Sequence, residues 1–255
     1  MTKATADKNV VILGGSSGIG RATALRFAKE GWQVIIGAPD EYGVQEVLQQ
    51  LEGSGHAGYH VDVRYEDNIR EFCNAVKNQY GSIHTLVNSV GISEGTPVLE
   101  SDFKQWNNSL EVMLYGTVRS CRELAPLIVN GGRIVHITSI HYERVAEGSS
   151  AYGMAKAAIT QFTRSLAVEL APRNILANAI APGFVNTPMS VKADGRNELD
   201  TDWFRDNYIK YGHLPLKRSG EPGEIAGVAY FLAGADASYI TGSVITVDGG
   251  LTITF

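Results

Sequence analysis

Short apolar runs alternate with helix-like segments along the chain. Residues 10–13 form an apolar run that ends at Gly14, and residues 21–30 show helical spacing of apolar side chains. The same alternation predicts further strands at 34–36, 59–63, 83–87, 133–138, 175–180 and 243–247, and helices at 44–51, 69–80, about 102–129, 150–171 and 222–233. Such β/α alternation predicts an α/β fold, a doubly wound parallel sheet with helices on both faces.

One segment, residues 183–214, interrupts this alternation. It is long and mixes polar residues with aromatic ones. Long insertions in compact domains are often binding loops, so we expect a substrate loop or lid here, and the alternative is a surface excursion closed by a short helix. No linker or internal repeat divides the chain, so residues 1–255 are interpreted as a single domain.

Composition and charge narrow the class of protein. Hydrophobic residues make up 44% and charged residues 19% of the chain, which is typical of folded globular proteins. The net charge of −5, without a clustered Lys/Arg run, argues against nucleic acid or an anionic membrane as a partner. Without an apolar leader or a bilayer-length apolar run, we expect a cytoplasmic protein. Cys73 and Cys121 lack metal-ligand spacing, so no metal site is expected.

A glycine-rich turn joins the first predicted strand to the first predicted helix. Residues 14–20 read GGSSGIG, which combines a tight turn, room for a pyrophosphate and a helix N-terminus that attracts anions. A glycine-rich turn alone is weak evidence for dinucleotide binding, because glycine occurs in any turn that requires positive φ. Its position directly after the strand is the context that a dinucleotide motif requires, so the chain is predicted to bind NAD or NADP in a Rossmann-like fold.

Tyr152 and Lys156 are four residues apart, which places both side chains on one face of the predicted helix. A phenol with a pKa near 10 is too weak an acid for neutral pH, and a neighbouring ammonium favours the phenolate and lowers that pKa. Ser139 follows the strand at 133–138, at the edge where ligands bind in open α/β sheets. The alternatives are a half-exposed amphipathic pair and a capping serine.

Together with Pro182-Gly183 and the ending 247–250 (VDGG), these elements resemble the short-chain dehydrogenase/reductase (SDR) family over nearly the whole chain. The resemblance implies an NAD(P)-dependent oxidoreductase that acts on CH–OH groups, in one dinucleotide-binding and catalytic domain. It implies that Tyr152 exchanges the proton of the substrate oxygen, Ser139 orients that oxygen, and Lys156 holds the nicotinamide ribose. It also implies homotetramers or homodimers, with the apolar end 251–255 as a contact segment.

The resemblance also assigns the cofactor site. Asp62 and Val63 would flank the adenine, and Val185 and Thr187 would contact the nicotinamide amide. The complete set of expected cofactor contacts is Gly14, Ser16, Ser17, Gly18, Ile19, Gly20, Asp40, Asp62, Val63, Asn88, Gly91, Tyr152, Lys156, Pro182, Gly183, Val185 and Thr187.

The choice between NAD and NADP depends on the residues after the second strand. The stretch 37–41 (GAPDE) has neither an Asp at the family's usual position nor an Arg beside it. Asp40 and Glu41 would repel a 2′-phosphate, so we predict NAD over NADP. The alternative is that both are helix N-terminal charges favoured by the macrodipole.

Three positions depart from the family pattern. Leu13 replaces a threonine before the first glycine, and Ser89-Val90 replaces Asn-Ala. Met113 stands where the family has its catalytic-tetrad asparagine, and a thioether cannot make the hydrogen bonds of an amide. In the family that asparagine helps to hold a water that links the lysine to solvent, partly through its backbone carbonyl. We therefore predict an active enzyme with an altered proton relay.

The substrate is the least determined feature. His141 and Tyr142 follow Ser139, and Trp203 and Tyr208 lie in the 183–214 segment. Such residues suit a polar, hydroxylated compound, and the alternative for each is a surface or lid-packing role. We predict a secondary alcohol or ketone as substrate, with sugars and polyols included. The rival readings are a 3-oxoacyl thioester reductase and a non-catalytic nucleotide-sensing protein, for which Met113 is the support.

Overall fold

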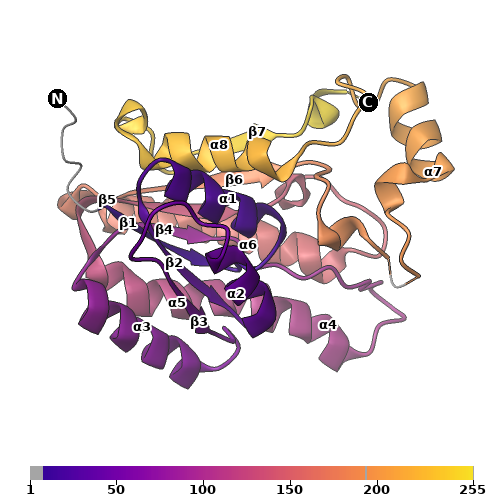
Figure 1. The fold of residues 1–255 in the computed structure, drawn as a ribbon. Helices are drawn as coiled ribbons and strands as arrows, with labels where there is room; N and C mark the ends of the chain where they lie inside the picture. The colour runs from indigo at the N-terminus through magenta and orange to yellow at the C-terminus, as the bar shows by residue number, and fades with distance from the viewer. Residues whose placement is uncertain (1–7, 193, 255) are drawn as a thin grey trace.

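The computed structural model describes residues 8–192 and 194–254 of the chain (Figure 1). Its centre is a sheet of seven strands in the order β3-β2-β1-β4-β5-β6-β7. The pairings between neighbouring strands are all parallel. The predicted doubly wound α/β architecture is therefore confirmed.

The strands and helices alternate as the hydrophobic pattern indicated. The strands are β1 (Asn9–Leu13), β2 (Gln33–Ala38), β3 (Ala57–His60), β4 (Ile83–Asn88), β5 (Ile128–Ile137), β6 (Leu176–Pro182) and β7 (Val244–Val247). The helices are α1 (Gly18–Lys29), α2 (Glu41–Leu48), α3 (Glu66–Tyr80), α4 (Phe103–Ser109), α5 (Gly116–Leu124), α6 (Ser150–Glu169), α7 (Asp202–Phe204) and α8 (Pro222–Ala233). Within the described part of the chain, no helix combines the length and apolarity needed to cross a membrane.

Two apolar layers hold the helices to the sheet. Successive residues of β1 point to opposite faces, so Val10 and Ile12 join the core beneath α1 and α8, whereas Val11 and Leu13 join the core shared with α3 and α5. Both faces are covered, which explains why β1 reads as an uninterrupted apolar run.

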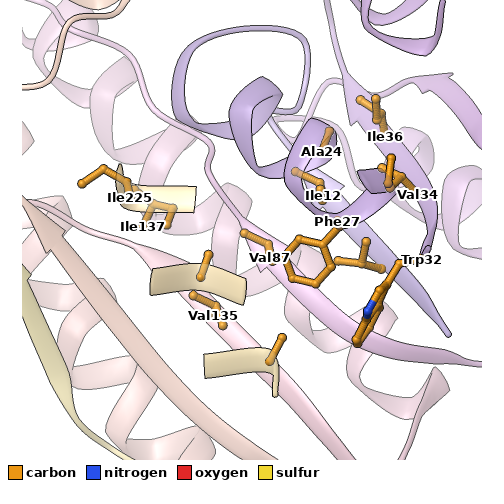
Figure 2. Packing of buried hydrophobic residues seen from close by; sticks show 14 of the residues in the cluster. Ile12, Ala24, Phe27, Trp32, Val34, Ile36, Val87, Val135, Ile137 and Ile225 are labelled. Atoms are coloured by element: carbon orange, nitrogen blue, oxygen red, sulfur yellow. The ribbon is translucent and has the colours of Figure 1, made fainter. Parts of the chain in front are cut away.

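Phe27 of α1 lies at the centre of the first core. Its side chain is 0% exposed. Figure 2 shows its ring beside Val87 of β4 and Trp32, and the Phe27 and Trp32 rings meet edge to face with centroids 5.1 Å apart. This contact fixes α1, and with it the glycine-rich turn before α1, against the sheet.

The long helix predicted at about 102–129 is largely confirmed, because the backbone stays helical from Phe103 to Leu127. The hydrogen bonding changes along it: α4 continues into a π-helical segment η1 (Leu110–Tyr115), then into α5, and ends in a short 3-10 helix η2 (Ala125–Leu127). Pro126 offers no N–H to continue the helix, and Ile128 already pairs with Ile83 as part of β5. The apolar spacing was correct, but it did not show where the helical hydrogen bonding changes.

The strand predicted at 59–63 is also displaced. β3 covers Ala57–His60, and Asp62 and Val63 lie beyond it in a turn. The turn forms because the Asp62 carboxylate accepts the backbone N–H of Arg64 at 3.0 Å, and the Asp62 carbonyl accepts that of Tyr65 at 3.1 Å.

Replacing Phe27 tests this packing. We expect Phe27→Ala to lower the free energy of unfolding by about 3–5 kcal/mol, because it removes a large buried ring and leaves a cavity. Urea unfolding followed by far-UV circular dichroism measures the change. Tyr239, which is fully exposed, provides the control, and Tyr239→Ala should change the free energy by less than about 0.5 kcal/mol. Equal effects of the two substitutions would contradict this account of the core.

Candidate active site

The turn between β1 and α1 is too tight for side chains at its glycines. Gly14 has φ +74°, and a Cβ there would lie 2.8 Å from the carbonyl oxygen of Ser89. A Cβ on Gly20 would lie 2.1 Å from the carbonyl oxygen of Gly14. The N-cap residue of α1, Ser17, makes no side-chain hydrogen bond to the helix. The N–H groups of the first turn are therefore available to an anion, as a pyrophosphate requires.

This turn lies at the switch point of the sheet. β1 pairs with β2 on one side and with β4 on the other, and α1 and α3 cover opposite faces. Ligands of doubly wound sheets bind outside the carboxyl ends of the strands at this point. The glycine cradle and the helix N-terminus therefore fit a dinucleotide.

Ser139, Tyr152 and Lys156 come together beside this switch point. Ser139 follows β5, is 8% exposed, and its Oγ accepts the backbone N–H of His141 at 3.2 Å. Tyr152 and Lys156 lie one turn apart on α6, with the Lys156 Nζ 5.6 Å from the centroid of the Tyr152 ring. Lys156 Nζ donates to the carbonyl of Ile137 at 3.0 Å, which ties α6 to the end of β5.

The pKa of Tyr152 does not move in the direction expected from the sequence. Burial raises the pKa of its phenol, and a hydrogen bond with Ser139 partly offsets that increase. Burial also lowers the pKa of Lys156 to about 8. Removal from water disfavours the charged form of each group. In this structure burial, and not the Lys156 amine, therefore sets the direction in which the pKa of the Tyr152 phenol moves.

Thr96 positions the start of α6, and sequence reasoning missed it. Its backbone N–H donates to the carbonyl of Gly148 at 2.6 Å, and its hydroxyl accepts the N–H of Ala151 at 3.2 Å. Its carbonyl accepts the Ser150 hydroxyl at 2.6 Å. These bonds fix the turn immediately before Tyr152, and nothing local in the sequence signals them because the partners are more than fifty residues apart.

Met113 lies in η1 and is 0% exposed. It packs with Leu110, Ala155 and Ile159, and Tyr152 borders the same cluster. The Met113 carbonyl accepts the Thr117 hydroxyl at 2.6 Å. The backbone carbonyl that the family pattern relates to the proton relay is therefore already hydrogen-bonded in this chain.

Asn88 was predicted to contact the cofactor, yet its side chain is turned inward. It is 3% exposed; its Nδ2 donates to the Thr117 hydroxyl at 3.1 Å and its Oδ1 accepts the N–H of Val90 at 3.0 Å. Its polar atoms thus stabilise the chain after β4. Gly91, three residues on, does lie in the site, because a Cβ there would be 3.7 Å from Lys156 Nζ.

Asp40 and Ser16 lie near each other beside the glycine turn, since a Cβ added at Gly43 would be 2.4 Å from an Asp40 carboxylate oxygen and 3.1 Å from the Ser16 Cβ. Asp40 is the N-cap of α2 and accepts the N–H of Gly43 at 3.0 Å. Glu41 pairs with His60 at 3.4 Å. The helix N-terminal role left open by the sequence is therefore realised for Asp40.

Asp62 and Val63, which are expected near the adenine, lie in different surroundings. The guanidinium of Arg64 donates to both carboxylate oxygens of Asp62, at distances from 2.6 to 3.1 Å. This pairing holds the pKa of Asp62 below its ordinary value. Val63 is buried, at 6% exposed. The carboxylate therefore has an intramolecular partner that the sequence did not reveal.

The chain after β6 returns to the glycine turn. Pro182 is the last residue of β6, and a Cβ on Gly183 would lie 2.8 Å from the Cβ of Asp248. Val185 is buried, and Thr187 lies against Gly18, where an added Cβ would be 3.4 Å from the Thr187 Cβ. Thr187, expected at the nicotinamide, and Gly18, expected at the pyrophosphate, are thus neighbours.

Of the residues proposed for the substrate, His141 lies beside Tyr152, whereas Trp203 and Tyr208 lie together in the segment 183–214. His141 meets the Tyr152 ring edge to face, with centroids 5.4 Å apart. Tyr142, the next residue, is half-buried, and burial raises the pKa of its phenol. Trp203 and Tyr208 pack on each other, with ring centroids 5.6 Å apart, outside the Ser139 cluster.

Residues 183–214 form a small structure with its own core. Short helical segments, including α7 and the π-helical segment η7 (Arg205–Lys210), surround Leu199, Phe204 and Leu214. A cavity of about 380 Å³ lies against this segment, and its lining residues include neither Ser139, Tyr152 nor Lys156. The segment is thus a packed excursion, and its role as a lid stays a prediction. Leu251 packs on the same core, whereas Phe255 lies outside the described residues.

Comparison with known proteins matches residues 14–252 to a family model described as "Enoyl-(Acyl carrier protein) reductase". An uncharacterized oxidoreductase of Bacillus subtilis, YxbG, is 36% identical over 250 residues, covering 96% of this chain and 91% of that protein. The 3-oxoacyl-[acyl-carrier-protein] reductase FabG of Thermotoga maritima is 35% identical over 250 residues, covering 96% and 98%.

The structure of the aldohexose dehydrogenase of Thermoplasma acidophilum superposes with a TM-score of 0.85 at 30% identity, covering 98% of this chain and 95% of that one. These similarities span the sheet, the glycine turn and α6 together. The chain therefore belongs to the short-chain dehydrogenase/reductase family, whose members are oxidoreductases that act on CH–OH groups of small molecules with an NAD(P) cofactor.

Proposed function

We propose that this enzyme interconverts a secondary alcohol and its ketone, with sugars and polyols among the candidate substrates, and uses NAD as cofactor. The observation that carries the proposal is the convergence of Ser139, Tyr152 and Lys156 beside the glycine turn. A hydroxyl, a phenol and an amine at the carboxyl edge of the sheet provide the hydrogen bonds and the proton that reduction of a carbonyl requires.

The roles of the three residues follow from their contacts. Ser139 Oγ accepts the His141 N–H, and its hydroxyl, which hydrogen-bonds with Tyr152 in this structure, would donate to the substrate oxygen. Tyr152 donates its phenolic proton to that oxygen in reduction and accepts it in oxidation. Lys156 is held by the Ile137 carbonyl and has two further N–H donors when charged, which would bind the ribose hydroxyls of the cofactor. When bound, the nicotinamide supplies or accepts the hydride.

The residues that would hold the cofactor follow the carboxyl ends of β1, β3, β4 and β6. We assign the pyrophosphate to the backbone of the glycine turn and the first turn of α1, and the nicotinamide to Val185 and Thr187. The adenine would lie near Val63 and the Asp62–Arg64 pair. A homotetramer or homodimer, and a cytoplasmic location, stay predictions.

The names of the relatives suggest two substrate classes, 3-oxoacyl thioesters and aldohexoses. The alternative to the proposal is therefore a 3-oxoacyl thioester reductase. A panel of ketones, aldoses, polyols and a 3-oxoacyl thioester, followed by nicotinamide absorbance, separates the two. Turnover confined to the thioester would favour the alternative.

Tyr152→Phe tests the assignment of the acid/base. We expect kcat to fall by about 10²- to 10⁴-fold, because the variant cannot transfer the proton while the ring and its packing remain. Nicotinamide absorbance measures turnover, and tryptophan fluorescence quenching by NADH measures cofactor binding, which should change little. A variant that turns over within a few-fold of the parent would contradict the assignment.

The preference for NAD is tested at Asp40. Its carboxylate lies beside Ser16, where a 2′-phosphate would be repelled, so we expect NAD to bind about tenfold or more tightly than NADP. Asp40→Asn keeps an oxygen that can cap α2 but removes the charge, and it should narrow the difference. Isothermal calorimetry measures both affinities. Equal affinities of the parent protein for the two nucleotides would reject the proposal.

Met113→Asn tests the altered proton relay. An added amide beside α6 supplies hydrogen bonds that the thioether lacks, so we expect kcat to change severalfold. The new amide should also lessen the desolvation of Lys156, whose pKa burial lowers to about 8, and so raise that pKa. The limb of the pH–rate profile that reports Lys156 should then shift to higher pH. Met113→Leu keeps the apolar packing and serves as the control. An unchanged rate and pH profile in Met113→Asn would disprove this idea.

A further inference from the structure

His141 is fixed between two parts of the catalytic cluster. It lies in the short 3-10 helix η3 (Ile140–Tyr142), and its backbone N–H donates to the Ser139 Oγ at 3.2 Å. Its backbone oxygen faces α6, 3.4 Å from where a Cβ on Gly153 would lie. The main chain of His141 is therefore held by Ser139 on one side and by the residue after Tyr152 on the other.

The imidazole of His141 is edge to face with the Tyr152 ring, at an interplanar angle of 88°. Its Nδ1 is buried and has no hydrogen-bond partner among the described residues. A buried polar atom without a partner is costly, and such atoms in folded proteins call for a physical explanation. Here the atom belongs to a side chain that touches the proposed acid/base.

Two of the other residues considered for the substrate have aromatic partners elsewhere. Trp203 and Tyr208 pack on each other, and Tyr208 also meets Phe184, at 4.7 Å between centroids. Of the four residues that the sequence singled out, His141 is the one in ring contact with Tyr152.

We propose that His141 Nδ1 hydrogen-bonds a second oxygen of the substrate, on the carbon next to the reacting carbon, so that the enzyme prefers vicinal diols and α-hydroxy ketones. This inference rests on the proposed function and deepens it. The edge-to-face contact places the imidazole ring of His141 directly beside the ring of the proposed acid/base, which suits a second oxygen on a carbon next to the reacting one better than an oxygen at the far end of a molecule.

The charge of His141 favours a hydroxyl over an anionic group. Burial lowers the pKa of the imidazole, so it is neutral at neutral pH. A neutral imidazole has one donor and one acceptor nitrogen, and a hydroxyl can pair with either. A carboxylate or phosphate at this position would gain no ion pair from His141.

Matched pairs of substrates test the inference. The probes are 2-butanone with 3-hydroxy-2-butanone, and cyclohexanone with 2-hydroxycyclohexanone. We expect a higher kcat/KM for the hydroxylated member of each pair. The ratio of kcat/KM for the hydroxylated member to that for the other member should fall by about tenfold or more in His141→Phe. Phenylalanine keeps an aromatic ring against Tyr152 and removes only the nitrogens. Val145→Ala, at a side chain that is 97% exposed in the same loop, is the control and should keep the ratio.

Two further variants separate hydrogen bonding from packing. The amide of His141→Asn lies near the position of Nδ1, whereas the longer His141→Gln reaches toward Nε2. The inference predicts that Asn retains more of the preference than Gln. If His141→Phe lowers kcat/KM equally for both members of a pair together with Tm, His141 has only a structural role and the inference is overturned.

The outcomes also distinguish this inference from the proposed function. If the parent enzyme turns over members of the alcohol and ketone panel, but the ratio is the same in His141→Phe, only the role of His141 is rejected. Turnover confined to substrates without an oxygen beside the reacting carbon rejects it as well. If no secondary alcohol or ketone is turned over, or Tyr152→Phe matches the parent, the proposed function itself fails.

Discussion

The hydrogen bond from Lys156 to the carbonyl of Ile137 determines the geometry of the active site. The amine is 3% exposed, so this bond at 3.0 Å offsets part of the cost of its burial. It joins α6 to the end of β5, and Ser139 follows Ile137 by two residues. The same bond therefore sets where Ser139 stands relative to Tyr152, which lies one turn earlier on α6. A cluster assembled from a strand end and a helix depends on this connection.

A second set of buried polar contacts supports the segment η1, which packs against α6 beside Tyr152. Asn88 donates to Thr117, and Thr117 donates to the carbonyl of Met113, which links the end of β4 to the π-helical segment η1. π-helical segments occur frequently at functional sites because they change the direction of side chains within a helix. Here the segment turns an apolar side chain, Met113, toward α6. Buried hydrogen bonds thus hold this segment in place, and Met113 packs in an apolar cluster against α6.

The glycine turn and the segment 183–214 differ in what determines their shape. At the glycine turn, close approach of backbone atoms leaves no space for side chains, so its shape is fixed by the main chain. On the substrate side, residues 183–214 have a separate small core around Phe204. That core is separate from the two cores that hold the helices to the sheet.

Sequence pattern alone predicts the order of strands and helices, the glycine turn and the pairing of Tyr152 with Lys156, because these depend on periodicity and on residues close together in the chain. The same reasoning located the helix at 102–129 but not the π-helical stretch within it, since apolar spacing does not register where hydrogen bonding changes. It also did not indicate the buried hydrogen bonds of the Asn88 side chain.

The state of the polar groups depends on contacts between segments that are far apart in the sequence. Asn88 bonds to Thr117, and Thr96 anchors α6. The Nδ1 of His141 has no hydrogen-bond partner among the residues that the structure describes. Likewise, the raised pKa of Tyr152 follows from burial, which no neighbouring residue reports. Local sequence specifies which groups are present, whereas solvent exclusion and distant partners fix their charge and their hydrogen bonds.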